Sequence, residues 1–333
     1  MDGAVEVAMS DPDVELRAFS WDDLATVVDL INRSDAADGL DRGTSDQLLR
    51  AQWASPGADP ERHAFLAVVD SELVGYGRID LRAGNAQTGF SKFQCYGRVL
   101  PAWRGQGIGS RILSECERRA RSRIDEAPTP TVYLETSADQ RQKDVAELYA
   151  AFGLQPVRYF FVMVYDAPEI PDEPQYPSGY SARGFTADQD EEITWQVLNT
   201  AFEDHWGHVS FPFESWLHWI ESGLFDPDLV FLGLSPTGDL VGECLCLIDA
   251  EQNKRRGRED GWIDSLGVLR GHRGRGLGRA LLLGGMRALR RVGCTHLKLG
   301  VDADNPTGAL GLYRSAGFQE SKTGVTFQKT LRQ

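Results

Sequence analysis

The chain has 333 residues, of which 41% are hydrophobic, and it carries a net charge of −14 with a pI near 4.9. This length suggests two domains, each long enough to bury a core of its own. The acidic charge argues against a general affinity for nucleic acid or for an anionic membrane surface.

The first half is predicted to alternate strands with helices. Apolar runs bounded by turn residues indicate strands, and apolar residues at helical spacing indicate amphipathic helices. Ser20 is a good N-cap and Gly153 a good C-cap. In chain order we expect a strand over 14–19, helices over 20–32 and 45–53, strands over 64–69, 73–81 and 93–100, a helix over 108–124, a strand over 131–135, a helix over 145–152 and a strand over 157–165.

A proline-rich segment then separates two halves of similar pattern. Its four prolines predict a stiff, extended linker over 167–179, with one domain over 1–166 and another over 180–333.

Both halves have the order β-α-α-β-β-β-α-β-α-β, which is typical of a mixed α/β sheet. In the second half we expect a strand over 180–184, helices over 188–202 and 213–221, strands over 229–234 and 240–248, a charged hairpin loop over 253–260, a strand over 261–269, a helix over 277–292, a strand over 296–299, a helix over 307–316 and a strand over 324–331.

One glycine-rich turn occurs in both halves, between a strand and a helix. It reads RGQGIG over Arg104–Gly109 and RGRGLG over Arg273–Gly278. Glycines leave the backbone N–H groups of such a turn accessible, and the helix N-terminus adds partial positive charge. The pattern therefore predicts two cradles for a pyrophosphate. The dinucleotide fingerprint G-x-G-x-x-G and the lysine of a P-loop are missing from both copies.

This order of elements, with the sequences over 99–109 and 268–278, resembles the GNAT superfamily of acetyl-CoA-dependent N-acetyltransferases. A second signature of that family, formed by Asn305, Tyr313 and Gly317-Phe318, stands in the second half. The first half keeps Tyr149 but has Arg141 where the second has Asn305. Two such domains in one chain are similar in architecture to mycothiol synthase, whose C-terminal domain is regarded as catalytic.

The resemblance implies two tandem GNAT domains, with acetyl-CoA (coenzyme A) as the cofactor of the cradles. We expect the second domain to be catalytic and the first to bind acetyl-CoA or to be structural. The implied cofactor-binding residues are Leu266, Gly267, Val268, Arg273, Gly274, Arg275, Gly276, Leu277, Gly278, Arg279, Asn305 and Tyr313 in the second half, and Val99, Arg104, Gly105, Gln106, Gly107, Ile108 and Gly109 in the first.

Direct acetyl transfer from a thioester to an amine needs a base for the ammonium proton and an acid for the leaving thiolate. By resemblance, the acid is Tyr313 and the main-chain N–H of Val268 polarises the thioester carbonyl. The base is left open among Glu243 and Asp264, ranked together, and then His205. A salt bridge, a turn cap or an exposed side chain is the alternative role of each.

The loop after the first helix of the second half concentrates acids, imidazoles and an indole. An acidic cleft walled by aromatic side chains suits a cationic amine. We therefore expect the substrate to contact Glu203, Asp204, His205, Trp206 and Phe211. In the first half the segment 32–35, Asn-Arg-Ser-Asp, stands at this place.

The sequence therefore predicts an N-acetyltransferase acting on a small-molecule amine. The alternatives are a protein lysine or N-terminal acetyltransferase and a non-catalytic CoA-binding sensor or scaffold. Five cysteines without a C-x-x-C pair argue against a disulfide framework or a zinc ribbon, and we expect no metal site. Without a membrane span or a signal peptide at Met1–Asp13, we expect a cytoplasmic monomer or homodimer.

Overall fold

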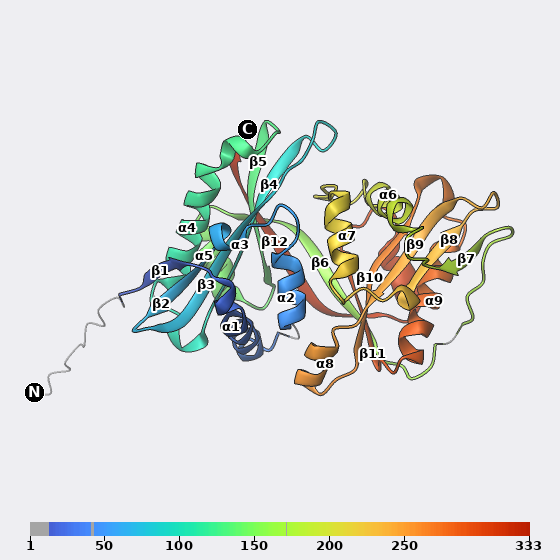
Figure 1. Ribbon diagram of the computed structural model, residues 1–333, viewed down its shortest axis with the longest axis horizontal. Coiled ribbons are helices and arrows are strands. Elements are labelled where there is room, and N and C mark those ends of the chain that lie inside the picture. The colour runs from blue at the N-terminus through green and yellow to red at the C-terminus, as the bar shows by residue number, and fades with distance from the viewer. Residues whose placement is uncertain (1–12, 41–42, 171) are drawn as a thin grey trace, which may run out of the picture.

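The computed structural model describes residues 13–40, 43–170 and 172–333, so the expectation for the N-terminal segment falls mostly outside the described residues. Twelve strands form one continuous sheet (Figure 1). The first half supplies β1 (Glu15–Ala18), β2 (Ala64–Val69), β3 (Glu72–Arg82), β4 (Phe90–Val99), β5 (Thr131–Asp139) and β6 (Gln155–Tyr165), and the second supplies β7 (Ser181–Gly184), β8 (Val230–Leu234), β9 (Leu240–Leu247), β10 (Asp260–Val268), β11 (His296–Asp302) and β12 (Gln319–Arg332).

The two halves exchange their last strands. The strand order is β1-β2-β3-β4-β5-β12-β6-β11-β10-β9-β8-β7. The last strand of the first half, β6, therefore pairs with β11 of the second half, and β12 pairs with β5 of the first. β6 and β12 also pair with each other, antiparallel, in the middle of the molecule (Figure 1). The sequence predicted both strands but not this exchange.

Helices cover both faces of the sheet in each half. In the first half, α1 (Leu24–Ala37), α2 (Asp46–Trp53) and α3 (Pro60–His63) precede β2, and α4 (Ile108–Ser122) and α5 (Lys143–Ala151) follow β4 and β5. Alternate residues of β2 belong to different cores, since Phe65 packs in the α4 core and Leu66 in the α1 core. The second half has α6 (Glu191–Ala201), α7 (Phe213–Glu221), α8 (Ala250–Arg256), α9 (Leu277–Arg291) and α10 (Ala309–Ser315).

Each half contains one pair of parallel neighbours, and these strands diverge at the end that carries the glycine turn. β4 pairs with β5 only from Phe90 to Gln94, although β4 continues to Val99 and β5 to Asp139. In the same way β10 pairs with β11 only as far as Ile263. The diverging strand ends leave a wedge-shaped opening in the sheet, next to the N-terminus of α4 or α9.

The predicted elements are present, with one error. The segment 253–260 was expected to be a charged hairpin loop, whereas residues 250–256 form α8. Asp249 caps this helix by accepting a hydrogen bond from the N–H of Gln252 (2.9 Å), and Gly257 ends it in the left-handed conformation, at φ 59°. The basic residues that suggested a loop form its last turn, where cations are favourable.

The linker is fastened to α9. The Arg287 side chain donates to the carbonyl of Asp172 (2.8 Å), and Arg279 forms an ion pair with the Asp172 carboxylate (2.5 Å). The described part of the segment between the halves is therefore held against the second half.

Among the described residues, none of the helices has the length and apolar character needed to cross a bilayer.

Candidate active site

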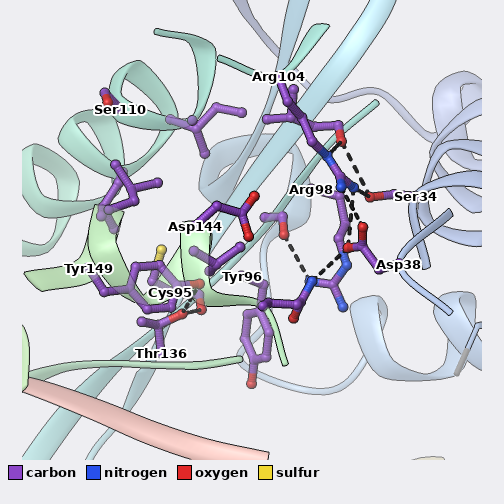
Figure 2. A pocket seen from close by; sticks show the side chains of 18 of the residues that line it. Ser34, Asp38, Cys95, Tyr96, Arg98, Arg104, Ser110, Thr136, Asp144 and Tyr149 are labelled. Atoms are coloured by element: carbon purple, nitrogen blue, oxygen red, sulfur yellow. Dashed lines mark hydrogen bonds and ion pairs between the residues drawn. The ribbon is translucent and has the colours of Figure 1, made fainter. Parts of the chain in front are cut away.

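The wedge of each half holds a cavity. We call the cavity of the first half the first cradle. It has a volume of about 410 Å³ and is lined by the end of β4, the turn 104–109, the start of α4, and Tyr149 of α5 (Figure 2). The second cradle, of about 250 Å³, is lined by the corresponding parts of the second half, including Tyr313 of α10 and His205. Of the predicted cofactor residues, the cavities are lined by Val99, Arg104, Gly105, Gly107, Gly109, Leu266, Gly267, Val268, Arg273, Gly274, Gly276, Gly278, Arg279 and Tyr313.

Both glycine turns have the geometry of an anion site. Gly105 and Gly107 have φ of 74° and 78°, and Gly274 and Gly276 have φ of 72° and 99°, values that favour glycine. The first backbone hydrogen bond of α9 runs from the N–H of Ala280 to Gly276 (3.1 Å). The N–H groups ahead of it are thus available to an anion at the helix N-terminus, and α4 begins in the same way. The turns fit the diphosphate of coenzyme A.

Several predicted cofactor residues have other surroundings. Ile108 and Leu277 are buried in the cores. Gln106 donates to the carbonyl of Ala102 (3.1 Å), and Arg275 is exposed. Asn305 accepts from the N–H of Thr307 (2.8 Å), so its side chain caps the turn before α10 rather than lining the cavity.

The arginine that opens each turn binds protein groups. Nε of Arg273 donates to the carbonyl of Val268 (2.8 Å), Nη1 to Asp204 (2.6 Å) and Nη2 to the carbonyl of Ala201 (2.8 Å). Arg104 similarly binds Val99, Ser34 and Asp38 (Figure 2). These guanidinium groups connect the end of β4 to α1 and the end of β10 to α6. Each also has a carboxylate partner, so its charge is already paired.

Glu243 is a buried carboxyl group beside the second cradle. It lies on β9 and is 0% exposed, and its Oε1 accepts a hydrogen bond from Ser265 Oγ (2.9 Å). Within the described residues, its Oε2 has no hydrogen-bond partner. Burial raises the pKa of Glu243 to about 8. A carboxyl group with a pKa near neutral pH can accept and release a proton under physiological conditions.

Gly267 provides the space for this carboxylate. It is the register partner of Glu243 on β10. A Cβ atom at this position would lie 2.6 Å from Glu243 Oε1 and 2.9 Å from the Cβ of Ala201. The backbone of Gly267, which also lines the cavity, therefore approaches the carboxylate because no side chain intervenes.

The other candidate bases lie in different environments. Asp264 is exposed and occupies the extra position of a β-bulge, where the register of β10 shifts between Ile263 and Ser265. His205 lines the cavity, with its ring 4.3 Å from that of Phe202. Burial lowers the pKa of His205, while the nearby carboxylate of Asp302 acts in the opposite direction.

Tyr313 lines the second cradle and is buried. Its pKa is raised by burial, and the neighbouring Cys244 and Glu243 act in the same direction. Its hydroxyl group is therefore protonated at neutral pH and can serve as a proton donor.

The predicted acceptor loop is divided between structural and accessible groups. Asp204 is paired with Arg270 and Arg273. Trp206 contacts Phe160 of β6, with the ring centroids 6.3 Å apart, and Glu203 is exposed. Main-chain groups of Phe211 bind Trp195 and Asn199, so this residue anchors the loop. His205 is the one predicted substrate residue that lines the second cradle.

The first cradle carries different side chains at the equivalent positions. Arg98 takes the place of Gly267, and its register partner is Tyr76 rather than a carboxylate. Tyr76 is buried in the α1 core, and Arg98 is held by Asp35 (2.7 Å). Burial raises the pKa of Tyr149, the counterpart of Tyr313, to about 12. Asp38, rather than the segment 32–35, is the counterpart of Asp204, since each binds the first arginine of its turn.

The sequence profile of the acetyltransferase (GNAT) family matches residues 26–154 and 192–318. The chain belongs to this family. A mycothiol acetyltransferase of Saccharomonospora viridis is 33% identical over 77% of this chain and 79% of its own. One from Thermobispora bispora is 30% identical over 95% and 99%. The solved GCN5-related N-acetyltransferase of Sphaerobacter thermophilus has a TM-score of 0.76 at 30% identity and covers 97% of this chain and 98% of its own.

Membership confirms the predicted fold of two tandem GNAT domains and the predicted enzyme class. The protein is an N-acetyltransferase, and acetyltransferases of this fold take acetyl-CoA as donor.

The sequence pattern did not identify Ser265, which donates a hydrogen bond to the Glu243 carboxylate, or the pairing of Arg98 with Asp35. All five cysteines are buried free thiols, and the described residues contain no group of three or more His, Cys, Asp or Glu side chains placed to hold a metal ion.

Proposed function

We propose that the second half transfers the acetyl group of acetyl-CoA directly to the amine of a small molecule, with Glu243 as the base. The observation that carries this proposal is the buried Glu243 carboxyl group beside the second cradle, with a pKa of about 8 and a free Oε2 within the described residues. The first half has Tyr76 at this position, so we assign catalysis to the second half.

The residues of the second cradle have separate tasks in this proposal. The N–H groups of Gly274 to Leu277 would hold the diphosphate, and acetyl-CoA, when bound, supplies the activated acetyl group. The main-chain N–H of Val268 would donate to the thioester carbonyl oxygen, where negative charge develops. Glu243 would take one proton from the ammonium form of the acceptor, so that the nitrogen can form a bond with the acetyl carbon. As the carbon–sulfur bond breaks, Tyr313 would give its proton to the departing thiolate, and the second proton lost by the nitrogen would restore the Tyr313 hydroxyl group. Arg273 would keep the turn in place.

The acceptor is proposed to be a small-molecule amine because the relatives named above are mycothiol acetyltransferases and match nearly the whole chain. The loop 203–208 also leaves an exposed carboxylate, Glu203, at this side of the second half. Such a charge favours a protonated amine near the entrance.

The first cradle is proposed to bind coenzyme A without catalysing transfer. Its glycine turn has the same backbone geometry as the catalytic one, and its cavity is the larger of the two. The position on β3 that corresponds to Glu243 is taken by Tyr76, the register partner of Arg98, so the neighbouring strand supplies no carboxylate there.

A thiol-release assay tests the function. Acetyl-CoA is incubated with a panel of aminosugars, amino acid derivatives and other small amines, and free coenzyme A is measured. We expect at least one amine to raise coenzyme A release above the hydrolysis background, with acetylated amine found by mass spectrometry. Calorimetry with acetyl-CoA should give two binding events per chain. Binding without any accepted amine would instead favour a CoA-binding sensor.

A further inference from the structure

The exchanged strand β6 brings an arginine of the first half to two segments whose other residues line the second cradle. Arg158 makes two parallel hydrogen bonds with Asp302, from Nε to Oδ1 (2.8 Å) and from Nη2 to Oδ2 (2.8 Å). Its Nη2 also donates to the carbonyl of Asp304 (3.0 Å). Asp302 is buried, and a bidentate pair of this kind fixes the orientation of both side chains.

Asp302 is the last residue of β11 and begins the turn that leads to α10. Its Oδ1 also accepts the N–H of Asp304 (3.0 Å). Further along the same turn, Thr307 and Gly308 line the second cradle, and α10 carries Tyr313. The arginine therefore holds the start of a segment whose end forms one wall of the cavity.

Arg158 also reaches the acceptor loop. Its guanidinium carbon lies 5.9 Å from the centroid of the Trp206 ring, a distance at which a cation attracts an aromatic face. Phe160, two residues further on the same face of β6, packs against the same indole. The neighbouring residue of the loop, His205, lines the cavity and lies within electrostatic range of Asp302.

We propose that Arg158 is a positioning residue of the second cradle, which sets the turn 302–308 and the loop 203–208 relative to each other. The catalytic half is therefore completed by a side chain of the other half, delivered by strand exchange. This inference rests on the proposed function of the second cradle, but its structural part can be tested without any acceptor.

The first cradle is arranged differently. Asp139 is the last residue of β5, as Asp302 is of β11, and it is bound by Arg141 of the same segment (Nε to Oδ1, 2.8 Å). Arg141, which supplies this pair, stands where the second half has Asn305.

The experiment compares Arg158→Gln with Arg158→Lys and with Arg183→Gln in the full-length chain. Arg183 forms a bidentate pair with Asp190 at the start of α6, away from the cavity, and controls for the loss of an Arg–Asp pair. Hydrogen–deuterium exchange is followed in peptides that cover 203–208 and 302–308. We expect about tenfold faster exchange of both segments in Arg158→Gln, a smaller change in Arg158→Lys, because lysine lacks the planar fork, and none in Arg183→Gln.

Kinetics give the second readout. With an amine that the wild-type enzyme accepts, we expect kcat/KM to fall about 10- to 100-fold in Arg158→Gln, since small displacements of aligned groups have effects of this size, and to recover in part in Arg158→Lys. Unchanged exchange of both segments, or an equal change in Arg183→Gln, would overturn the inference. If no amine is accepted, the proposed function fails, and the exchange data still decide whether Arg158 holds the two segments.

Discussion

The two halves share a fold and a glycine turn but differ where a strand faces its neighbour beside the cradle. In the second half Glu243 faces Gly267, and the glycine leaves room for a buried carboxylate. In the first half Tyr76 faces Arg98, and both are engaged in structural contacts. Under the proposed function, holding the cofactor and performing the chemistry are divided between the halves, since the glycine turn is kept in both and the carboxylate in one.

The strand that precedes the turn differs as well. β10 has a bulge at Asp264, whereas the pairing of β4 with β3 runs without a register shift. Bulges are frequent next to active sites, because they redirect main-chain and side-chain groups. The first half therefore has a regular strand where the second has an irregular one.

The strongest test of the comparison removes the carboxylate. We expect Glu243→Gln to lower kcat by about 1,000-fold, the size of effect associated with loss of a general base, while acetyl-CoA still binds. Coenzyme A release and calorimetry measure the two quantities. Tyr76→Phe in the first half is the matched control, and a loss of kcat comparable to that of Glu243→Gln would remove the distinction between the halves.

The two tyrosines provide a second test. Tyr313→Phe should lower kcat by about 100-fold because the proton for the thiolate is lost, whereas Tyr149→Phe should leave kcat within about twofold. The rates of coenzyme A release by the two variants are compared at saturating acetyl-CoA, with an amine that the wild-type enzyme accepts. Equal losses in the two variants would mean that both cradles catalyse or that neither tyrosine is an acid.

A methyl group at Gly267 tests the need for space. Gly267→Ala should lower kcat by about tenfold, because the new Cβ would displace the carboxylate of Glu243 from its position. Gly271→Ala, at a position where a Cβ meets no atom within 4 Å, is the control. Wild-type kinetics of Gly267→Ala would show that the carboxylate tolerates displacement.

The smallest expected effect is on pH dependence. A base works in its deprotonated form, so the rate of the wild-type enzyme should rise with pH through an apparent pKa of about 8. Ser265 donates a hydrogen bond that lowers the pKa of Glu243. Ser265→Ala should therefore move the profile to higher pH and lower kcat/KM at pH 7 by about threefold. An unchanged profile would assign the titration to another group.

The sequence was sufficient to predict the elements that depend on local pattern. The duplicated glycine turn predicted both cradles, because φ values and helix termini are properties of neighbouring residues. It ranked Glu243 and Asp264 together, ahead of His205, and could not separate the first two, since burial and register are set by strands distant in the chain. It assigned pyrophosphate contacts to Arg273, whose partners Asp204 and Ala201 lie far away in sequence.

The strand exchange was beyond local reasoning for the same reason. The apolar pattern of 157–165 predicts a strand but does not say which strand lies beside it. The pairing of β6 with β11 depends on contacts between residues about 140 positions apart, such as Arg158 and Asp302. The domain boundary in the linker remains a proposal on the basis of composition.

The interleaved final strands bear on how the protein is made. β5 receives its partner β12 only when residues 319–332 have left the ribosome, so this edge of the sheet of the first half stays unpaired while the second half is synthesised. Cutting the gene at the linker would give two fragments, each holding a strand that belongs to the other's sheet. Such fragments should aggregate when expressed alone and recover solubility when expressed together.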